Sequence, residues 1–285
     1  MKIVFYTGFA LVAFAFNSIL CRLALGMNLI DAASFTTIRI VSGAITLALI
    51  FLLIGKRNVE TKNGNWLSAF FLFAYAICLS FAYNYPTTGM CALIFFCCVQ
   101  ATMIIFALVK GERPNKLEWL GLLVAVAGLV YLVSPGLTAP PIFSAVLMAL
   151  AGIAWGFYTL RGRGSTNPLA DTMGNFIRAV PFVFISALPF INQIHLSKRG
   201  ILFAVLSGAI ASGIGYAVWY AALKFHTATR AAILQLSVPA LAAIGGVILL
   251  SEIVSFRLLL ATALILGGIA LAIVGRKYGK SKVKS

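Results

Sequence analysis

Two arginines stand inside otherwise apolar stretches, at equivalent places in the two halves of the chain. Arg39 lies about six residues into the run 33–54, and Arg178 lies about nine residues into the run 169–190. A guanidinium stays charged at physiological pH, so facing lipid would cost at least roughly 2–3 kcal/mol. Each arginine is therefore expected to face a cavity or a partner. It could attract a carboxylate or phosphate, or close a gate on its side of a site.

A plainer alternative is that each arginine snorkels to its own membrane surface or pairs with an aspartate about two turns earlier. Those aspartates belong to a group of six acids that all fall at predicted helix ends or in loops. The acids are Asp31, Glu60, Glu112, Glu118, Asp171 and Glu252. Both histidines, His195 and His226, are also placed in loops. No titratable carboxylate or imidazole is thus expected at mid-membrane.

The sequence offers little for catalysis or metal binding. It has no paired-carboxylate site, no HExxH motif and no glycine-rich phosphate loop. The five cysteines fall inside apolar runs without a CxxC pair, which favours small buried or lipid-facing side chains over disulfides or metal ligands. We expect neither an enzyme nor a bound cofactor or metal.

Amides and aromatic side chains deep inside apolar runs form a second group of candidates. They are Asn17, Tyr75, Gln100, Trp155, Tyr158, Tyr216, Trp219 and Gln235. An amide at mid-membrane needs a partner, either another helix or a solute. Helix packing is the commoner explanation for any one of them. As a group, with Arg39 and Arg178, they predict an amphipathic substrate-binding cavity for a modest organic solute rather than a bare ion.

Two prolines fall near the middle of apolar runs, Pro181 in the seventh and Pro239 in the ninth. A proline removes one backbone hydrogen bond, which can free a carbonyl toward a cavity or supply a hinge. A plain kink is the commoner outcome. We expect both positions to be hinges.

The elements that position these residues must be membrane-spanning helices. The chain is 62% hydrophobic and 10% charged, against about 25% charged in soluble proteins. Apolar runs near the length of a transmembrane helix occur at roughly 3–24, 33–54, 66–84, 88–109, 117–134, 141–160, 169–190, 200–222, 228–250 and 256–275. The prediction is an all-α integral membrane protein with ten transmembrane helices.

The two halves of the chain repeat at a near-constant offset. Residues 16–22 match residues 155–161, and Arg39 matches Arg178. Because each half has an odd number of helices, the second half must enter from the opposite side. The result is a pair of inverted five-helix repeats, an arrangement typical of transporters.

The predicted segments are a first repeat at 1–136, a second repeat at 137–276 and a basic cytoplasmic tail at 277–285. With both ends cytoplasmic, most Lys and Arg fall on the cytoplasmic side, as topology rules require. The other side receives Arg22, Lys198, Arg199 and Arg257. The net charge of +16 is therefore a topological signal, and no water-soluble basic face remains for nucleic acid. We expect a multi-pass protein of the cytoplasmic (inner) membrane.

Several motifs resemble the EamA branch of the drug/metabolite transporter superfamily. The signature of the family's second repeat resembles Arg230 to Pro239, Gly245 to Glu252 and Gly267-Gly268. A weaker first copy of that signature is found at Gly89 to Ile94, Gly111-Glu112 and Gly121 to Gly128. Ala154-Trp155-Gly156 resembles the family's motif early in the sixth helix. The first repeat departs from the pattern, with Gln100 near the place of Pro239 and Phe16-Asn17 in place of Trp-Gly. In having a glutamine at that place, the chain resembles the subset of the family that exports amino acids, including aromatic ones.

This resemblance implies a ten-helix fold, a central cavity and alternating access. The expected function is export or facilitated movement of a small organic metabolite, an amino acid or related compound. One alternative is exchange or import of an anionic or nucleotide-linked metabolite, with Arg39 and Arg178 as anion partners. Another is a lipid-handling or non-transporting membrane component. Expected partners are a small-molecule solute and the lipid bilayer, with monomer and homodimer both open.

The predicted topology can be tested with reporter fusions. Fusions after Lys62, Lys116 and Arg163 and in the C-terminal tail should all report a cytoplasmic location, because basic loops stay on that side. A periplasmic C-terminus would contradict the even number of crossings.

Overall fold

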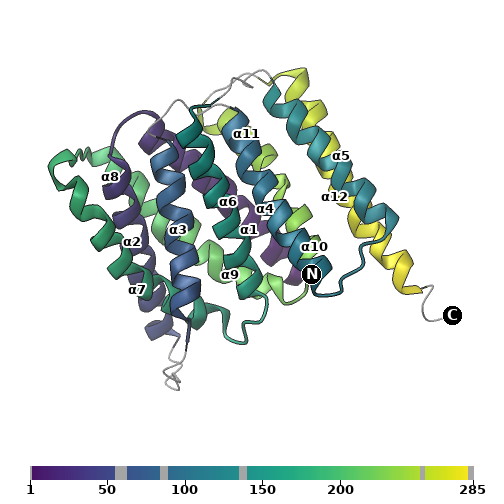
Figure 1. The fold of residues 1–285 in the computed structure, drawn as a ribbon, viewed down its shortest axis with the longest axis horizontal. Coiled ribbons are helices and arrows are strands. Elements are labelled where there is room, and N and C mark those ends of the chain that lie inside the picture. Colours follow the sequence, from purple (N-terminus) through teal and green to yellow (C-terminus); the bar gives the residue numbers. More distant parts are fainter. Residues whose placement is uncertain (1, 55–62, 84–88, 135–139, 251–253, 282–285) are drawn as a thin grey trace.

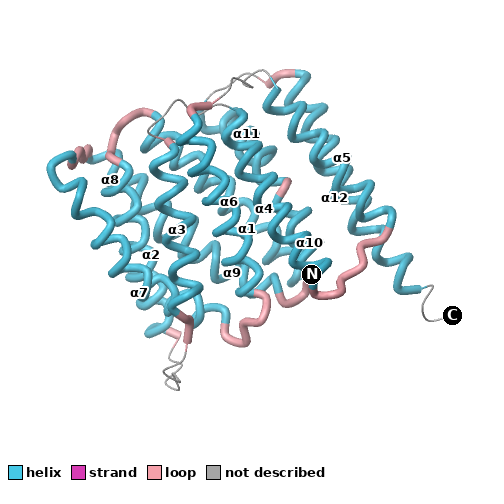
Figure 2. The backbone as a smooth tube through the Cα atoms, viewed as in Figure 1, coloured by secondary structure: helices cyan, strands magenta, loops and turns pink. Residues whose placement is uncertain are grey.

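The computed structural model describes residues 2–54, 63–83, 89–134, 140–250 and 254–281, which form a bundle of long helices (Figures 1 and 2). Glu60, Glu252 and the last residues of the predicted tail lie outside the described residues. The first half comprises α1 (Lys2–Cys21) with the π-helical η1 (Arg22–Gly26), α2 (Ala32–Leu53), α3 (Trp66–Ala82), α4 (Gly89–Val109) and α5 (Lys116–Val133).

The second half begins with a single helix and contains three composite rods. Its elements are α6 (Ile142–Gly162), α7 (Pro168–Ala187) with η3 (Leu188–Gln193), α8 (Lys198–Leu206) with the π-helical η4 (Ser207–Ile214) and α9 (Gly215–Leu223), α10 (Ala228–Gln235) with α11 (Ser237–Leu250), and α12 (Phe256–Ser281). The helix α12 runs past its predicted end into the predicted tail. A helix can continue beyond the membrane, and basic residues near its C-terminus favour this.

The described helices confirm the predicted membrane fold. Nine helical segments are long and apolar enough to cross a membrane, and the 17-residue α3 is a tenth, shorter apolar helix. Large apolar side chains project outward from the bundle, such as Leu53 and Ile142, each 85% exposed. In water such a surface would be costly, whereas lipid covers it without penalty.

The two halves interlock rather than pack as separate units. The first helix of the second half, α6, packs against α3 and α4 of the first half, while α1 packs against α9 and α11 of the second. The repeat-equivalent helices α2 and α7 pack together, as do α5 and α12 (Figure 1). This reciprocal exchange brings α1 and α6 into the middle of the bundle. Polar residues on these two helices therefore meet side chains from both halves.

Polar contacts tie the halves together at the end of the bundle where α2 begins. Asp31 caps α2 by accepting from the Ser34 backbone N–H at 2.8 Å, and its other oxygen accepts from the His195 N–H at 3.0 Å. The Asp31 N–H in turn donates to the His195 carbonyl at 3.0 Å. The segment before α2 is thus held to the segment before α8.

A second tie lies at the other end, between α4 and α10. Glu112 accepts from the backbone N–H groups of Ala228 at 3.0 Å and Thr229 at 3.3 Å, which are free donors at the start of α10. Arg163 forms an ion pair with the same carboxylate at 3.2 Å. The helix N-terminus and the arginine both favour the negative charge. Each end of the bundle therefore carries polar contacts between the two halves.

The helices α5 and α12 approach each other closely at Gly121 and Gly268. A Cβ on Gly268 would meet the Gly121 carbonyl oxygen and the Ala125 backbone nitrogen, whereas a Cβ on Gly267 would meet nothing within 4 Å. Small residues at such crossings let transmembrane helices pack through van der Waals contact.

Substituting these neighbouring glycines should separate packing from helix propensity. Gly268→Val should lower the free energy of unfolding by about 1–3 kcal/mol, because the added methyl groups force α5 and α12 apart. Gly267→Val is the matched control and should change it little. Thermal unfolding of the detergent-solubilised variants measures the difference, and equal effects at the two positions would contradict the packing argument.

Candidate functional site

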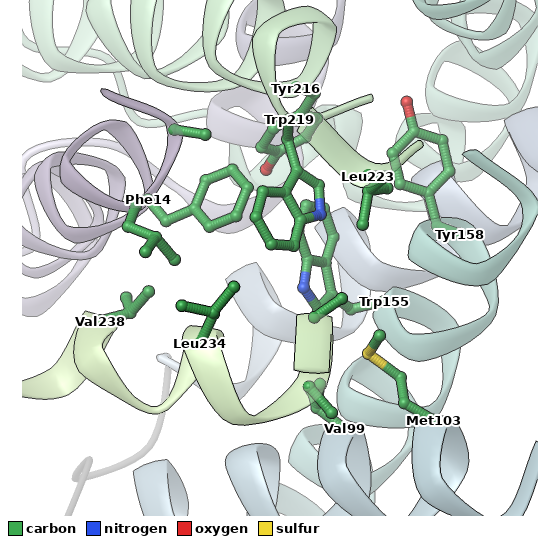
Figure 3. Packing of buried hydrophobic residues seen from close by; sticks show 14 of the residues in the cluster. Phe14, Val99, Met103, Trp155, Tyr158, Tyr216, Trp219, Leu223, Leu234 and Val238 are labelled. Carbon is green, nitrogen blue, oxygen red and sulfur yellow. The ribbon is translucent and has the colours of Figure 1, made fainter. Parts of the chain in front are cut away.

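An aromatic cluster fills the centre of the bundle where α1 and α6 meet α3 and α9. Phe14 packs edge-on against Trp155 with ring centroids 5.2 Å apart, and Trp155 lies 4.8 Å from both Tyr75 and Tyr216. Trp219 also packs edge-on against Phe14, with ring centroids 5.5 Å apart (Figure 3). Tilted and edge-to-face pairs of this kind stabilise beyond their buried area. The cluster draws on both halves of the chain.

A small cavity of about 40 Å³ opens within this cluster. Its lining consists of Phe14, Asn17, Ser18, Tyr75, Phe95, Phe96, Trp155, Tyr216, Gln235 and Val238. That volume holds a few water molecules at most, whereas ligand sites usually measure about 300–1,000 Å³. The helices must therefore move apart before an organic solute can enter. The lining is mainly aromatic with two amides.

Gln235 is held at the cavity by a break in its helix. The Trp155 indole N–H donates to the Gln235 side-chain oxygen, and the Gln235 amide nitrogen donates to the Ala231 carbonyl at 3.1 Å. α10 ends at Gln235 and α11 begins at Ser237. Pro239 has no N–H to donate to the Gln235 carbonyl four residues earlier, so the helix cannot continue regularly there. The break places the amide at the junction between α6 and α10.

The other two amides have different surroundings. Asn17 lines the cavity, and its side-chain oxygen accepts from the Ser207 hydroxyl at 2.6 Å. Gln100 does not line the cavity. Its amide nitrogen donates to the Ala232 carbonyl of α10 at 2.7 Å. Gln100 is therefore placed to support α10, one shell behind Gln235.

Arg39 lies behind the aromatic cluster and is almost completely buried, with 1% of its surface exposed. Its Nε donates to the Ser212 hydroxyl at 3.0 Å, and its Nη2 donates to the hydroxyls of Tyr216 at 2.7 Å and Tyr75 at 3.3 Å. The guanidinium carbon also stands 5.2 Å from the centre of the Tyr75 ring, within cation–π range. Its remaining nitrogen, Nη1, has no hydrogen-bond partner.

Arg178, the repeat equivalent of Arg39, is not brought to this cluster. It is half-buried, and its Nη1 donates to the backbone carbonyls of Asn63 at 2.8 Å and Gly174 at 3.0 Å. Asp171, which lies two turns earlier in α7, accepts instead from the Gly64 N–H at 3.0 Å. The two arginines are equivalent in sequence, yet Arg178 holds the segment before α3 while Arg39 stands beside the cavity.

The remaining candidates lie outside the cavity lining. Tyr158 and Trp219 are fully buried beside the aromatic cluster (Figure 3). α7 runs without interruption through Pro181, in contrast to the break near Pro239. His226, expected in a loop, does lie in the turn between α9 and α10, but it is buried and 2.9 Å from the Thr7 hydroxyl.

Sequence reasoning missed several residues of the site. Phe14, Phe95 and Phe96 line the cavity, but a phenylalanine in an apolar run gives no signal that separates it from ordinary core. Ser212 was missed because it reaches Arg39 from the π-helical η4, whose altered turn shifts the faces that a regular helix would present. An adjacent pattern of Ser and Gly at 207–213 is the one sequence feature that could have marked this segment.

The hydroxyls around Arg39 allow a graded test of its environment. Tyr216→Phe should lower the free energy of unfolding by about 1–3 kcal/mol, because it removes the shortest acceptor of a buried charged donor. Tyr75→Phe should cost less, since its bond is 3.3 Å long and the remaining ring keeps its cation–π contact. Unfolding of the purified variants in denaturing detergent measures both values. A reversed order would contradict this assignment of partners.

Comparison with known proteins agrees with the architecture. A solved structure covering 93% of this chain and 98% of its own superposes with a TM-score of 0.76 at 19% identity, which shows a shared fold. An uncharacterized protein of Pseudomonas aeruginosa is 48% identical across 95% of this chain and 94% of its own length. An uncharacterized transporter of Archaeoglobus fulgidus is 25% identical across 80% of this chain and 84% of its own.

A shorter match joins the chain to an uncharacterized inner membrane transporter of Escherichia coli, YedA, at 27% identity over 40% of this chain and 38% of that protein. The model of the EamA-like transporter family matches twice, at residues 1–134 and 142–274. These matches cover both halves of the bundle that encloses the central cavity. The chain therefore belongs to the EamA-like transporter family and is a membrane transporter of small solutes.

Proposed function

We propose that this protein is a secondary carrier that exports, or facilitates the movement of, an amino acid or related small metabolite across the cytoplasmic membrane. The observation that carries the proposal is the cavity between the interlocked halves, lined by Tyr75, Trp155 and Tyr216 with the amides of Asn17 and Gln235. Aromatic faces would stack on an apolar or aromatic body, and the amides would orient its polar groups. A bare ion would need a ring of oxygens or charges instead.

Alternating access accounts for both the small cavity and the ties at the two ends. At one end, Asp31 holds the His195 segment, and at the other, Glu112 holds the start of α10. Opening one tie at a time would expose the cavity to one side while the other stays shut. The break between α10 and α11 is the place where the second half would bend, with Pro239 as its hinge.

The solute's own gradient, or exchange, would supply the driving force. The described residues that line the cavity include no carboxylate, histidine or lysine, and the nearest buried charge is an arginine that stays protonated. A proton-coupled carrier needs a group whose protonation changes between its two states. Transport is accordingly expected to vary little between about pH 6 and 8.

Uptake by proteoliposomes over a panel of amino acids, organic acids, sugars and nucleotide-linked metabolites tests the proposal. We expect accumulation of at least one small organic solute, to the level of its external concentration. Gln235→Leu should slow that transport about tenfold or more, because it leaves the Trp155 N–H unpartnered and removes an amide from the cavity.

The matched control is Gln193→Leu, which changes an exposed glutamine in η3 that does not line the cavity. It should transport at the wild-type rate. Protein that moves no solute of the panel but transfers labelled lipid between leaflets would overturn the proposal in favour of a lipid-handling role.

A further inference from the structure

The buried charge of Arg39 identifies a chemical group on the solute. We propose that the carried solute presents a carboxylate to Arg39, replacing the tyrosine hydroxyls that now occupy its donors. This inference rests on the proposed carrier function and narrows it. It also assigns Tyr75 and Tyr216 a double role, as cavity lining and as the removable partners of the arginine.

The charge of Arg39 has no counter-charge among the described residues. Its three hydrogen-bond partners, Ser212, Tyr75 and Tyr216, are neutral hydroxyls, and Nη1 has no partner although Arg39 is 1% exposed. Removing an ion from water costs several kcal/mol unless an opposite charge and full hydrogen bonding offset it. Hydroxyls satisfy individual N–H groups, but they do not neutralise the ion. An anion beside the guanidinium would offset this charge.

The four acids among the described residues do not fill that place. Asp31 is committed to the start of α2 and to the His195 N–H, and Glu112 to the start of α10. Glu118 is committed to the capping box at the start of α5. Asp171 holds the Gly64 N–H. Glu60 and Glu252 lie outside the described residues.

The route from the cavity to Arg39 passes through two side chains. Tyr75 and Tyr216 both line the cavity, and both accept hydrogen bonds from the same Arg39 nitrogen. Their hydroxyl oxygens are 3.5 Å apart. A carboxylate entering an enlarged cavity could take over Nη2 and engage the unpartnered Nη1, the paired geometry that guanidinium and carboxylate prefer.

The displaced hydroxyls would then donate hydrogen bonds to the same anion. Arg39 can only donate hydrogen bonds, and the hydroxyls of Tyr75 and Tyr216 can donate as well, so the three side chains together are complementary to a carboxylate. A phosphate fits less well, because it carries nearly two charges and Arg178, the other intramembrane arginine, is bound to carbonyls elsewhere. The site therefore favours a monovalent carboxylate on an apolar or aromatic body.

The contacts that Arg39 makes between helices would also change when the solute binds. While it binds Ser212 in η4, Tyr75 in α3 and Tyr216 in α9, it joins α2 to elements of both halves. A solute carboxylate that takes its place among these hydroxyls would weaken that connection. Binding the correct solute would thus loosen the packing of α2 against the second half.

The test compares each solute that wild-type protein transports with its carboxamide derivative in proteoliposomes. Every transported solute should carry a carboxylate, and the amide should be transported at least about tenfold more slowly. In Arg39→Gln this preference for acid over amide should fall to about one. The control Arg199→Gln removes one positive charge from an exposed position at the start of α8 and should keep the wild-type preference.

Folding of the key variant is checked separately. Because Arg39→Gln removes an uncompensated charge, the variant should unfold at or above the wild-type temperature. If Arg39→Gln proves unfolded, Arg39→Lys keeps the charge without the planar fork and should retain part of the acid preference.

The outcomes separate the inference from the function on which it rests. Equal transport of acid and amide by wild-type protein, or an acid preference that survives in Arg39→Gln, would overturn the carboxylate site and leave the carrier function standing. Transport of no solute from the whole panel would overturn the carrier function, and the carboxylate site with it.

Discussion

A backbone inside hydrocarbon must satisfy its own N–H and C=O groups, and this constraint shapes the whole molecule. Regular helices meet it without help, so the described residues form a bundle of ten helical rods. Departures from regular geometry are tolerated only where protein or a cavity receives the freed groups. The π-helical η4 and the break between α10 and α11 both lie against the central aromatic cluster, where Ser212 and Gln235 find partners. These two irregular segments supply two of the polar side chains at the central cluster.

The interlocked halves convert an inverted repeat into an asymmetric site. α1 and α6 are equivalent in the repeat, and each is inserted among helices of the other half. They nevertheless contribute different chemistry, Phe14 and Asn17 from α1 and Trp155 from α6. Arg39 and Arg178 diverge in the same way, one toward the cavity and one toward a loop. The cavity lining is therefore asymmetric, although the two halves of the chain repeat.

Charge placement follows one rule throughout the described structure. Carboxylates stand at helix N-termini, where free N–H groups and the helix dipole stabilise them, as Asp31 does for α2 and Glu112 for α10. The cation Arg39 is stabilised differently, because it is buried among hydroxyls and aromatic faces beside the cavity. Its place beside the cavity is the basis of the proposed carboxylate site.

The sequence by itself determined the class of fold, the number of helices and the repeat. Hydrophobic length and charge distribution act locally along the chain, so they can be read without knowing which helices touch. Individual buried amides and arginines were also identifiable, because each is costly in an apolar run. Their partners were not, since Arg39 meets Ser212 and Trp155 meets Gln235 only through contacts between distant segments.

Tertiary structure alone decided which candidates share one site. It separated Arg178 and Gln100 from the cavity and added Phe14, Phe95 and Ser212. The reason is geometric: a helix periodicity predicts the faces of a regular helix, whereas η4 and the α10–α11 break change those faces where the site is built. Which side chains converge therefore depends on packing between the halves, a property that local sequence does not carry.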